Sequence, residues 1–447
     1  MDRIRKALRR TPSYEPLEGG SIGPDGERIE EESGGFSWAA YSVFSLIGIA
    51  MLWAWNMFLA AGPYFQYRFS DDAKILRSFQ SAELSVSTVA NLGSMLVLQK
   101  LQKNASYPKR IVASLIINIA TFTALTMSTK LFMGSSAGGY FAFIIIAVFA
   151  TSLATGLCQN GVFAYVQSFG REEYTQAIMT GQAVAGVLPC LAQIASVLSV
   201  PDTQADAKEN AHQQSNAAFA YFLTAVGVST LTLVAFFWLV AQQRSAAARK
   251  AARIENEEAE ESIDVEERKT VPLSVLAWKL RYLASSVFIT FALAMTFPVF
   301  TQRIVSVQPS SELPRILQPA AFIPLAFLVW NSGDLCGRLL TAVPRLSLTQ
   351  WPKTLVLFSI ARAGFVPLYL LCNIDDKGAL VKSDFFYLAV VQFLFGLTNG
   401  FAGSTSMMGA GEWVEPSERE AAGGFMGLCL VAGLAFGSLA SFFASGA

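Results

Sequence analysis

The sequence of 447 residues contains a single histidine, His212, and only 15% charged residues. His212 lies next to a polar loop, which argues against a histidine-ligated metal centre and against a Ser-His-Asp hydrolase. The five cysteines form no C-x-x-C pair and lie in or beside apolar stretches, which argues against a disulfide framework and a cysteine-ligated metal. We therefore expect no enzyme activity, no metal and no cofactor.

Charge is balanced as well as scarce, because 33 Lys and Arg residues face 33 Asp and Glu residues. Soluble domains contain roughly 25% charged residues, whereas this chain is 53% hydrophobic. We predict an all-α polytopic membrane protein whose surroundings are the lipid bilayer. The net charge of zero gives no argument for nucleic-acid binding, and the absence of a G-x-x-x-x-G-K-[ST] motif disfavours an ATP-driven pump.

The first 35 residues contain no apolar run of the kind found in a secretory signal peptide. They begin with the basic segment MDRIRKALRR and continue with Gly, Pro and Glu. We predict that residues 1–35 form a disordered cytoplasmic tail.

Long stretches without charge predict eleven membrane spans, because about 20 apolar residues are enough to cross a bilayer. The predicted spans are residues 41–65, 79–99, 111–129, 140–168, 174–200, 216–240, 280–304, 316–342, 352–373, 384–408 and 419–444. They divide into an N-terminal bundle of six helices within residues 36–242 and a C-terminal bundle of five within 276–447. A charged cytoplasmic loop, residues 243–275, joins the two bundles, either as a linker or as a short amphipathic helix.

The distribution of Lys and Arg predicts the orientation of these spans. With the N-terminus in the cytoplasm, more than twice as many Lys and Arg residues lie in cytoplasmic segments as in those on the other side. The odd span count then places the C-terminus on the exofacial or lumenal side. The N-x-S sequon at Asn104 falls in a cytoplasmic loop, so we expect it to stay unglycosylated.

Two charged residues, Asp334 and Arg338, interrupt the apolar stretch FLVWNSGDLCGRLLT. In a helix they lie four residues apart on one face, with Asn331 one turn before Asp334. A charge at the centre of a membrane helix costs roughly 2.5–3.5 kcal/mol on insertion scales, so such residues usually face a bundle interior or an aqueous cavity. We therefore predict a binding surface on this face.

A purely structural interpretation of the pair also stays open. In it, Asp334 and Arg338 only neutralise each other, while Gly333 and Gly337 provide a close-packing seam for a neighbouring helix. Binding and packing can also coexist on one helix.

Two more charged residues fall within predicted spans. Arg362 lies close enough to Lys353 to snorkel toward the surface or to form a structural pair, so we leave it outside the site. Glu83 lies near the outer end of the second span. A proton-sensing role and a wetted helix end are both open for Glu83, and we favour the wetted end.

Five segments carry recognisable motifs in a fixed order: AWNMFLAAGPYF, IMTGQAVAG, WNSGDLCGRLLTAV, ARAGFVPLYLLCN and PSEREAAGGFMGLCLVAGLAFG. Together with Phe297-Pro298 and the NGF segment at 399–401, they resemble signatures of the equilibrative nucleoside transporters. The resemblance covers nearly all of residues 36–447. Ala54 departs from it, because the family usually has proline at that position.

The resemblance implies an architecture like that of the major facilitator proteins with one span fewer, in which two bundles rock around a midplane site. It implies facilitative transport of purine and pyrimidine nucleosides, with nucleobases as a further substrate class, by alternating access and without a cofactor. The tail and the central loop resemble fungal endomembrane members, so we expect a vacuolar or lysosome-like membrane or the plasma membrane. We expect a monomer.

A nucleoside presents an aromatic base and two ribose hydroxyls, and the resemblance suggests residues for each. The predicted substrate-binding residues are Trp55, Asn56, Gln159, Asn331, Asp334 and Arg338. Trp55 can stack on a base, which is worth about 1–3 kcal/mol, although an interfacial position is its alternative. The Gln159 amide suits a base edge, and an interhelical hydrogen bond is its alternative. Asp334 accepts from ribose hydroxyls and Arg338 donates to them.

Two other functions stay open at this point. One is proton-coupled nucleoside symport through Asp334 or Glu83. The other is a membrane sensor or scaffold that does not transport and in which Asp334 and Arg338 are structural.

Overall fold

The structure, a computed structural model, describes residues 36–102, 105–131, 134–199, 207–257, 271–308 and 313–444. The predicted tail, residues 1–35, and the sequon at Asn104 lie outside these ranges. The described residues are almost entirely helical, and an isolated β-bridge joins Ile304 to Ile374.

The helices before the central loop form what we call the N-terminal group. They are α2 (Trp38–Ala60), α3 (Gly62–Arg68), α4 (Ala73–Lys100), α5 (Tyr107–Leu131), α6 (Ala137–Gln167), α7 (Glu172–Ser199) and α8 (Ala207–Glu257). Side chains that precede a helix start several of them, as at Ser37, Asp72 and Ser136, each of which accepts a hydrogen bond from a backbone N–H in the first turn.

The helices after the loop form the C-terminal group. They are α9 (Leu273–Lys279), α10 (Arg281–Ala294), α11 (Thr296–Thr301), α12 (Pro319–Leu340), α13 (Pro352–Ala361), α14 (Phe365–Tyr369), α15 (Leu394–Met408) and α16 (Arg419–Ala444). Short 3-10 turns are η1 (Arg315–Leu317), η2 (Pro344–Leu346), η3 (Arg362–Gly364), η5 (Gly409–Trp413) and η6 (Pro416–Glu418), and η4 (Phe386–Phe393) is a π-helix.

Ten helical stretches of the described residues are long and apolar enough to cross a membrane. The predicted ninth span, 352–373, is not among them, because it is divided into α13, η3 and α14. Pro367 lacks the N–H that would bond to the carbonyl of Ala363, and its ring crowds that carbonyl, which favours a break in the helix at this point. The prediction of eleven continuous spans is therefore wrong at this segment.

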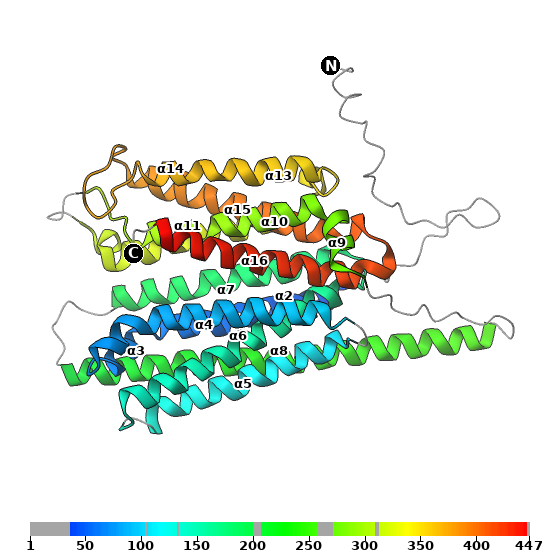
Figure 1. Ribbon diagram of the computed structural model, residues 1–447, viewed down its shortest axis with the longest axis horizontal. Helices are drawn as coiled ribbons and strands as arrows, with labels where there is room; N and C mark the ends of the chain where they lie inside the picture. Colours follow the sequence, from blue (N-terminus) through cyan, green and yellow to red (C-terminus); the bar gives the residue numbers. More distant parts are fainter. Residues whose placement is uncertain are drawn as a thin grey trace, which may run out of the picture.

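The two groups form two layers that meet along α7 and α16 (Figure 1). In the N-terminal group α2 packs on α7 and α8, α5 packs on α6 and α8, and α4 packs on α6. In the C-terminal group α10 packs on α13, α15 and α16, and α12 packs on α15. Contacts of α12 with α7 and of α16 with α6 and α4 join the groups.

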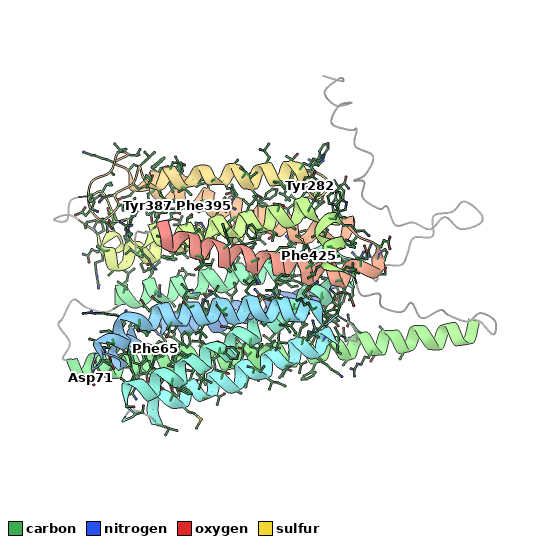
Figure 2. All side chains as sticks on the ribbon, viewed as in Figure 1. Phe65, Asp71, Tyr282, Tyr387, Phe395 and Phe425 are labelled. Atoms are coloured by element: carbon green, nitrogen blue, oxygen red, sulfur yellow. The ribbon has the colours of Figure 1, made fainter. Side chains whose placement is uncertain are left out.

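The apolar core differs between the two ends of the molecule. We call the end at which α2 begins end A, and the end at which α2 finishes end B; they lie on the right and left of Figure 1. At end A, one cluster contains residues of both groups, such as Phe163 and Phe425. At end B, each group has its own cluster, one around Phe65 and the other around Tyr387 and Phe395 (Figure 2).

Helix α8 runs without interruption past residue 242 to Glu257 and extends beyond the rest of the molecule at end A (Figure 1). The first part of the predicted charged loop, 243–257, is therefore a continuation of the sixth span. Residues 258–270 lie outside the described ranges.

Candidate functional site

Asp334 and Arg338 form a buried ion pair on α12. Arg338 Nε donates to Asp334 Oδ2 at 2.7 Å. Asp334 is 2% exposed and Arg338 is 5% exposed. Removing one partner of such a pair leaves an uncompensated buried charge, so each residue requires the other. The predicted polar face of α12 is present and is turned away from lipid.

The Asp334 carboxylate continues into a chain of hydrogen bonds through the C-terminal group. Asn399 Nδ2 on α15 donates to Asp334 Oδ1 at 2.7 Å, and Arg362 Nη2 in η3 donates to Asn399 Oδ1 at 2.8 Å. We call these three residues the Asp334 relay. Arg362 is 2% exposed, so the snorkelling alternative is wrong and Arg362 is a structural partner.

Arg338 reaches in the opposite direction, into the N-terminal group. Its Nη1 donates to the Met179 carbonyl oxygen at 2.6 Å and to Gln182 Oε1 at 3.2 Å, both on α7. Gln182 Nε2 donates to the Met51 sulfur on α2 at 3.1 Å. The ion pair therefore lies where the two groups meet, so a ligand held there would contact both.

Interlocking glycines bring α12 and α15 close enough to form the Asp334 relay. A Cβ atom added at Gly333 would collide with the carbonyl oxygen of the last residue of η4, and one added at Gly337 with a carbonyl oxygen of α15. A Cβ atom added at Gly396 or Gly400 would collide with carbonyl oxygens of α12. This reciprocal contact is the small-residue packing that lets membrane helices approach closely. The seam predicted at Gly333 and Gly337 is confirmed, and it coexists with the ion pair.

The predicted residues Asn56 and Asn331 lie on opposite sides of one turn of α7. Asn56 Nδ2 on α2 donates to the Ala185 carbonyl oxygen at 2.7 Å. Asn331 Nδ2 donates to the Phe327 carbonyl oxygen at 2.8 Å, and its side-chain oxygen packs directly over Gly186. Both amides are therefore occupied by contacts within the protein, and α7 separates them.

Trp55 and Gln159 lie apart from this cluster. The half-buried Trp55 ring stacks on Phe58 with centroids 6.0 Å apart and an interplanar angle of 5°. In the part of the chain that the structure describes, no hydrogen bond or ring contact joins Trp55 or Gln159 to α12. The structure gathers the other predicted residues around α7 and does not bring these two to them.

Gln159 is instead one of three residues on α4 and α6 whose buried side-chain oxygens have no hydrogen-bond partner among the described residues. Gln159 is 3% exposed, and its Oε1 has no hydrogen-bond partner among the described residues. Asn91 Oδ1 and Glu83 Oε1 on α4 are also buried without a partner. We call Glu83, Asn91 and Gln159 the α4–α6 seam. Buried acceptors are nearly always satisfied in proteins, so each of these oxygens can accept a donor from water or a ligand.

Glu83 is only 6% exposed. The sequence-based preference for a wetted helix end is therefore wrong. Ser87, one turn further along α4, shares a 2.9 Å hydrogen bond with Ser152 on α6, which places this polar face of α4 against α6.

The sequence-based site omitted Gln182, Asn399 and Arg362. The first two lie inside the motif segments 178–186 and 399–401, so the resemblance contained a signal for them. Arg362 is a charged residue deep in an apolar stretch. Because a buried charge must be paired, its position in the sequence already indicated a partner inside the protein.

Comparison with known proteins identifies the family. A family model described as Nucleoside transporter matches residues 143–445. The chain is 32% identical over 446 residues to Nucleoside transporter FUN26 of Saccharomyces cerevisiae, with 90% of this chain and 83% of FUN26 covered. This chain belongs to the equilibrative nucleoside transporter family. It is also 27% identical over 466 residues to human Equilibrative nucleoside transporter 1, with 90% and 96% covered.

The transporter is therefore an integral multi-pass membrane protein that carries nucleosides, and not an enzyme. Its fold is similar to that of solved major facilitator proteins. The proton:xylose symporter XylE aligns with a TM-score of 0.60 at 10% identity, over 90% of this chain and 86% of XylE. FucP, in an outward conformation, aligns with a TM-score of 0.57 at 11% identity, over 91% and 95% of the two chains.

Proposed function

We propose that the transporter moves nucleosides downhill, in either direction, by alternating access. Two bundles, residues 36–242 and 276–447, rock against each other, and the charged loop 243–275 joins them. The observation that carries this proposal is the core, which both groups share at end A and which is separate in each group at end B. A carrier of this kind needs one end sealed while the other parts.

In this proposal the chain crosses the membrane eleven times, with the broken segment 352–373 as the ninth crossing. End A is cytoplasmic, and the C-terminus is exofacial or lumenal. The excess of Lys and Arg in the segments at end A supports this orientation.

Direct hydrogen bonds between the groups support a seal at end A. Gln99 Nε2 on α4 donates to the Ala421 carbonyl oxygen on α16 at 3.2 Å. Gln167 Nε2 on α6 donates to the Met407 carbonyl oxygen on α15 at 3.4 Å. Both pairs must separate before a substrate can leave at end A.

A cross-link across this seal tests the mechanism. Gln99→Cys with Ala421→Cys, in a background without the native cysteines, is treated with a short, reductively cleavable thiol cross-linker. We expect saturable uridine flux into proteoliposomes to stop and to return after reduction, while each single variant treated in the same way stays active. Full flux through completely cross-linked protein would show that end A does not open during transport.

Within this mechanism we keep the predicted roles: Asp334 and Arg338 for the ribose hydroxyls, Gln159 for the base edge, Trp55 for the base face, and Asn56 and Asn331 as further site residues. In this structure Trp55 and Gln159 lie apart from the ion pair, so the two groups have to move before all of these residues contact one nucleoside. The position of the ion pair between the groups and the unpartnered Gln159 oxygen support these roles. We expect 2′,3′-dideoxyuridine to compete poorly with uridine and adenosine to compete well. Equal competition by uridine and its dideoxy analogue would remove the ribose assignment.

A second candidate function, proton-coupled symport, is favoured by Glu83. Its carboxyl group is buried in a membrane helix and forms no ion pair among the described residues, so a proton is the simplest means of neutralising it. The titratable side chains on the helices packed against α4 are Tyr140, Cys158 and Tyr165 on α6 and Arg419, Glu420 and Cys429 on α16.

The two candidates differ in whether a pH gradient performs work. Symport predicts uridine accumulation above equilibrium in proteoliposomes under an imposed pH gradient, and Glu83→Gln, which resembles the protonated residue, should abolish accumulation but keep downhill exchange. Absence of accumulation with the unmodified transporter rejects symport and leaves downhill transport.

A further inference from the structure

A groove of about 680 Å³ lies between α5 and α8, outside the nucleoside site. Its floor contains Phe236, which is fully buried and packs edge-on against the Tyr165 ring at 5.7 Å. Its rim contains Ile116 and Phe237, which are 52% and 53% exposed. Because the walls belong to two candidate membrane spans, the groove opens toward the surrounding lipid.

One end of this groove is positively charged. Lys109, in the first turn of α5, and Arg244 on α8 both line it at end A. Both are exposed, and neither forms an ion pair among the described residues. None of the described residues that line the groove is Asp or Glu. The site therefore attracts negative charge at a place where the membrane surface meets the end of the helices.

The remainder of the groove is lined by apolar side chains. From Pro108 to Ile116 the wall of α5 extends about 12 Å along the helix, at 1.5 Å per residue. The side chains along it are apolar on both helices, including Val112 and Val240. A soluble anion would leave this apolar length unfilled, whereas a lipid fills both parts.

We propose that the groove binds an anionic phospholipid. Its phosphate lies between Lys109 and Arg244, and one acyl chain lies along Val112, Ile116 and Phe237. A neutral lipid gains only the apolar contacts, whereas an anionic headgroup also gains the attraction of two cations. The lipid bridges α5 and α8, which stabilises their packing, because a ligand that binds only the folded state shifts the unfolding equilibrium.

Competition between two lipids tests this site. The purified full-length transporter is incubated with equal amounts of phosphatidylserine and phosphatidylcholine, and bound lipid is counted by native mass spectrometry. We expect phosphatidylserine to be retained preferentially. In the double variant Lys109→Gln and Arg244→Gln the preference should fall roughly 25-fold, because about 1 kcal/mol per cation corresponds to about a fivefold change each.

Two further variants separate the site from general surface charge. Lys100→Gln removes an exposed lysine at the same end that does not line the groove, so the preference should stay unchanged. Ala113→Trp fills the groove and should lower the retention of both lipids, with thermal unfolding confirming that the variant is folded. Equal retention of the two lipids by the unmodified protein, an unchanged preference in the double variant, or an equal loss in Lys100→Gln would overturn the proposal.

Discussion

The Asp334 relay and the α4–α6 seam differ in whether their buried polar side chains have hydrogen-bond partners within the protein. In the relay, the protein itself supplies the partners: Asn399 lies between Asp334 and Arg362, and donates to one while it accepts from the other. In the seam, buried oxygens of Gln159 and Glu83 have no partner among the described residues. One region is complete without a ligand, and the other gains hydrogen bonds when a donor arrives.

This difference determines how much each region contributes to stability. A satisfied network of buried groups holds its members rigidly, and breaking it leaves the remaining groups unpaired. An unpartnered buried acceptor already carries its desolvation penalty, so removing it costs the fold little. Mutations in the two regions should therefore have effects of different size, and even of different sign, on stability.

The largest effect is expected from Asp334→Ala, which leaves Arg338 without its carboxylate partner and removes the carboxylate that Asn399 links to Arg362. Breaking a buried pair costs roughly 3–5 kcal/mol, so we expect a large fall in the unfolding temperature measured in detergent and a loss of uridine flux. Asp334→Asn, which keeps the shape and one acceptor, should lose less stability. Equal melting of Asp334→Ala and the unmodified protein would contradict the relay.

Exchanging the two charges should also fail. Arg338 donates to the acceptors Met179 and Gln182 on α7, whereas a carboxylate at position 338 would face those acceptors with its own oxygens. We therefore expect Asp334→Arg with Arg338→Asp to be as unstable as Asp334→Ala, measured by the same thermal unfolding. A swapped protein of normal stability would mean that the pair serves only as a neutral pin.

An intermediate effect is expected from Asn399→Leu, because hydrogen bonds to charged groups contribute about 1.5–3 kcal/mol. Thr398→Val is the matched control, since it removes a weaker contact of 3.2 Å to Nε of the same Arg362. Thermal unfolding should rank Asn399→Leu as the more damaging change. The reverse ranking would show that Arg362 depends on Thr398 rather than on the relay.

Gln159→Leu should leave the unfolding temperature unchanged or raise it, since the amide oxygen has no partner to lose among the described residues. Uridine KM should rise up to about tenfold, as expected when one hydrogen bond of about 0.5–1.5 kcal/mol is missing. Asn91→Leu, which removes another unpartnered acceptor of the same seam, is the control. A stability loss as large as that of Asn399→Leu would show that the seam is not open.

The smallest effect is expected at an exposed ion pair near end B. Arg303 donates to Asp375 at 3.0 Å and 2.5 Å, and this guanidinium lowers the pKa of the Asp375 carboxyl to about 2. A lowered carboxyl pKa contributes stability above the unfolded value of about 3.9, which is lost as pH falls toward 2. Asp375→Asn should change the unfolding temperature only slightly at pH 7. Between the folded and unfolded pKa values of Asp375, the unfolding temperature of the variant should depend less on pH than that of the unmodified protein.

The sequence predicts the fold well wherever charges bound an apolar stretch. It does not predict the break at Pro367, because proline in a membrane helix is tolerated when neighbouring groups satisfy the freed backbone. The continuation of α8 past residue 242 was missed because SAAARKAARIENE is polar, although its residues favour a helix.

The candidate site was predictable only in its local part. The spacing of Asp334 and Arg338 follows from the helical period, and the pair forms as expected. Their partners Asn399 and Met179 are distant in the sequence, and spacing alone contains no information about such contacts. Glu83 was misjudged for the same reason, because its burial depends on α6.

The glycine seam between α12 and α15 limits how the transporter can move. Backbones in such close contact cannot slide or separate without opening voids along both helices, so α12 and α15 behave as one rigid body. Asp334 and Asn399 therefore travel together. In the proposed alternating-access mechanism, the contacts free to change are those that Arg338 makes with the Met179 carbonyl and the Gln182 amide on α7. These two groups then form the surface on which the two halves of the molecule turn against each other.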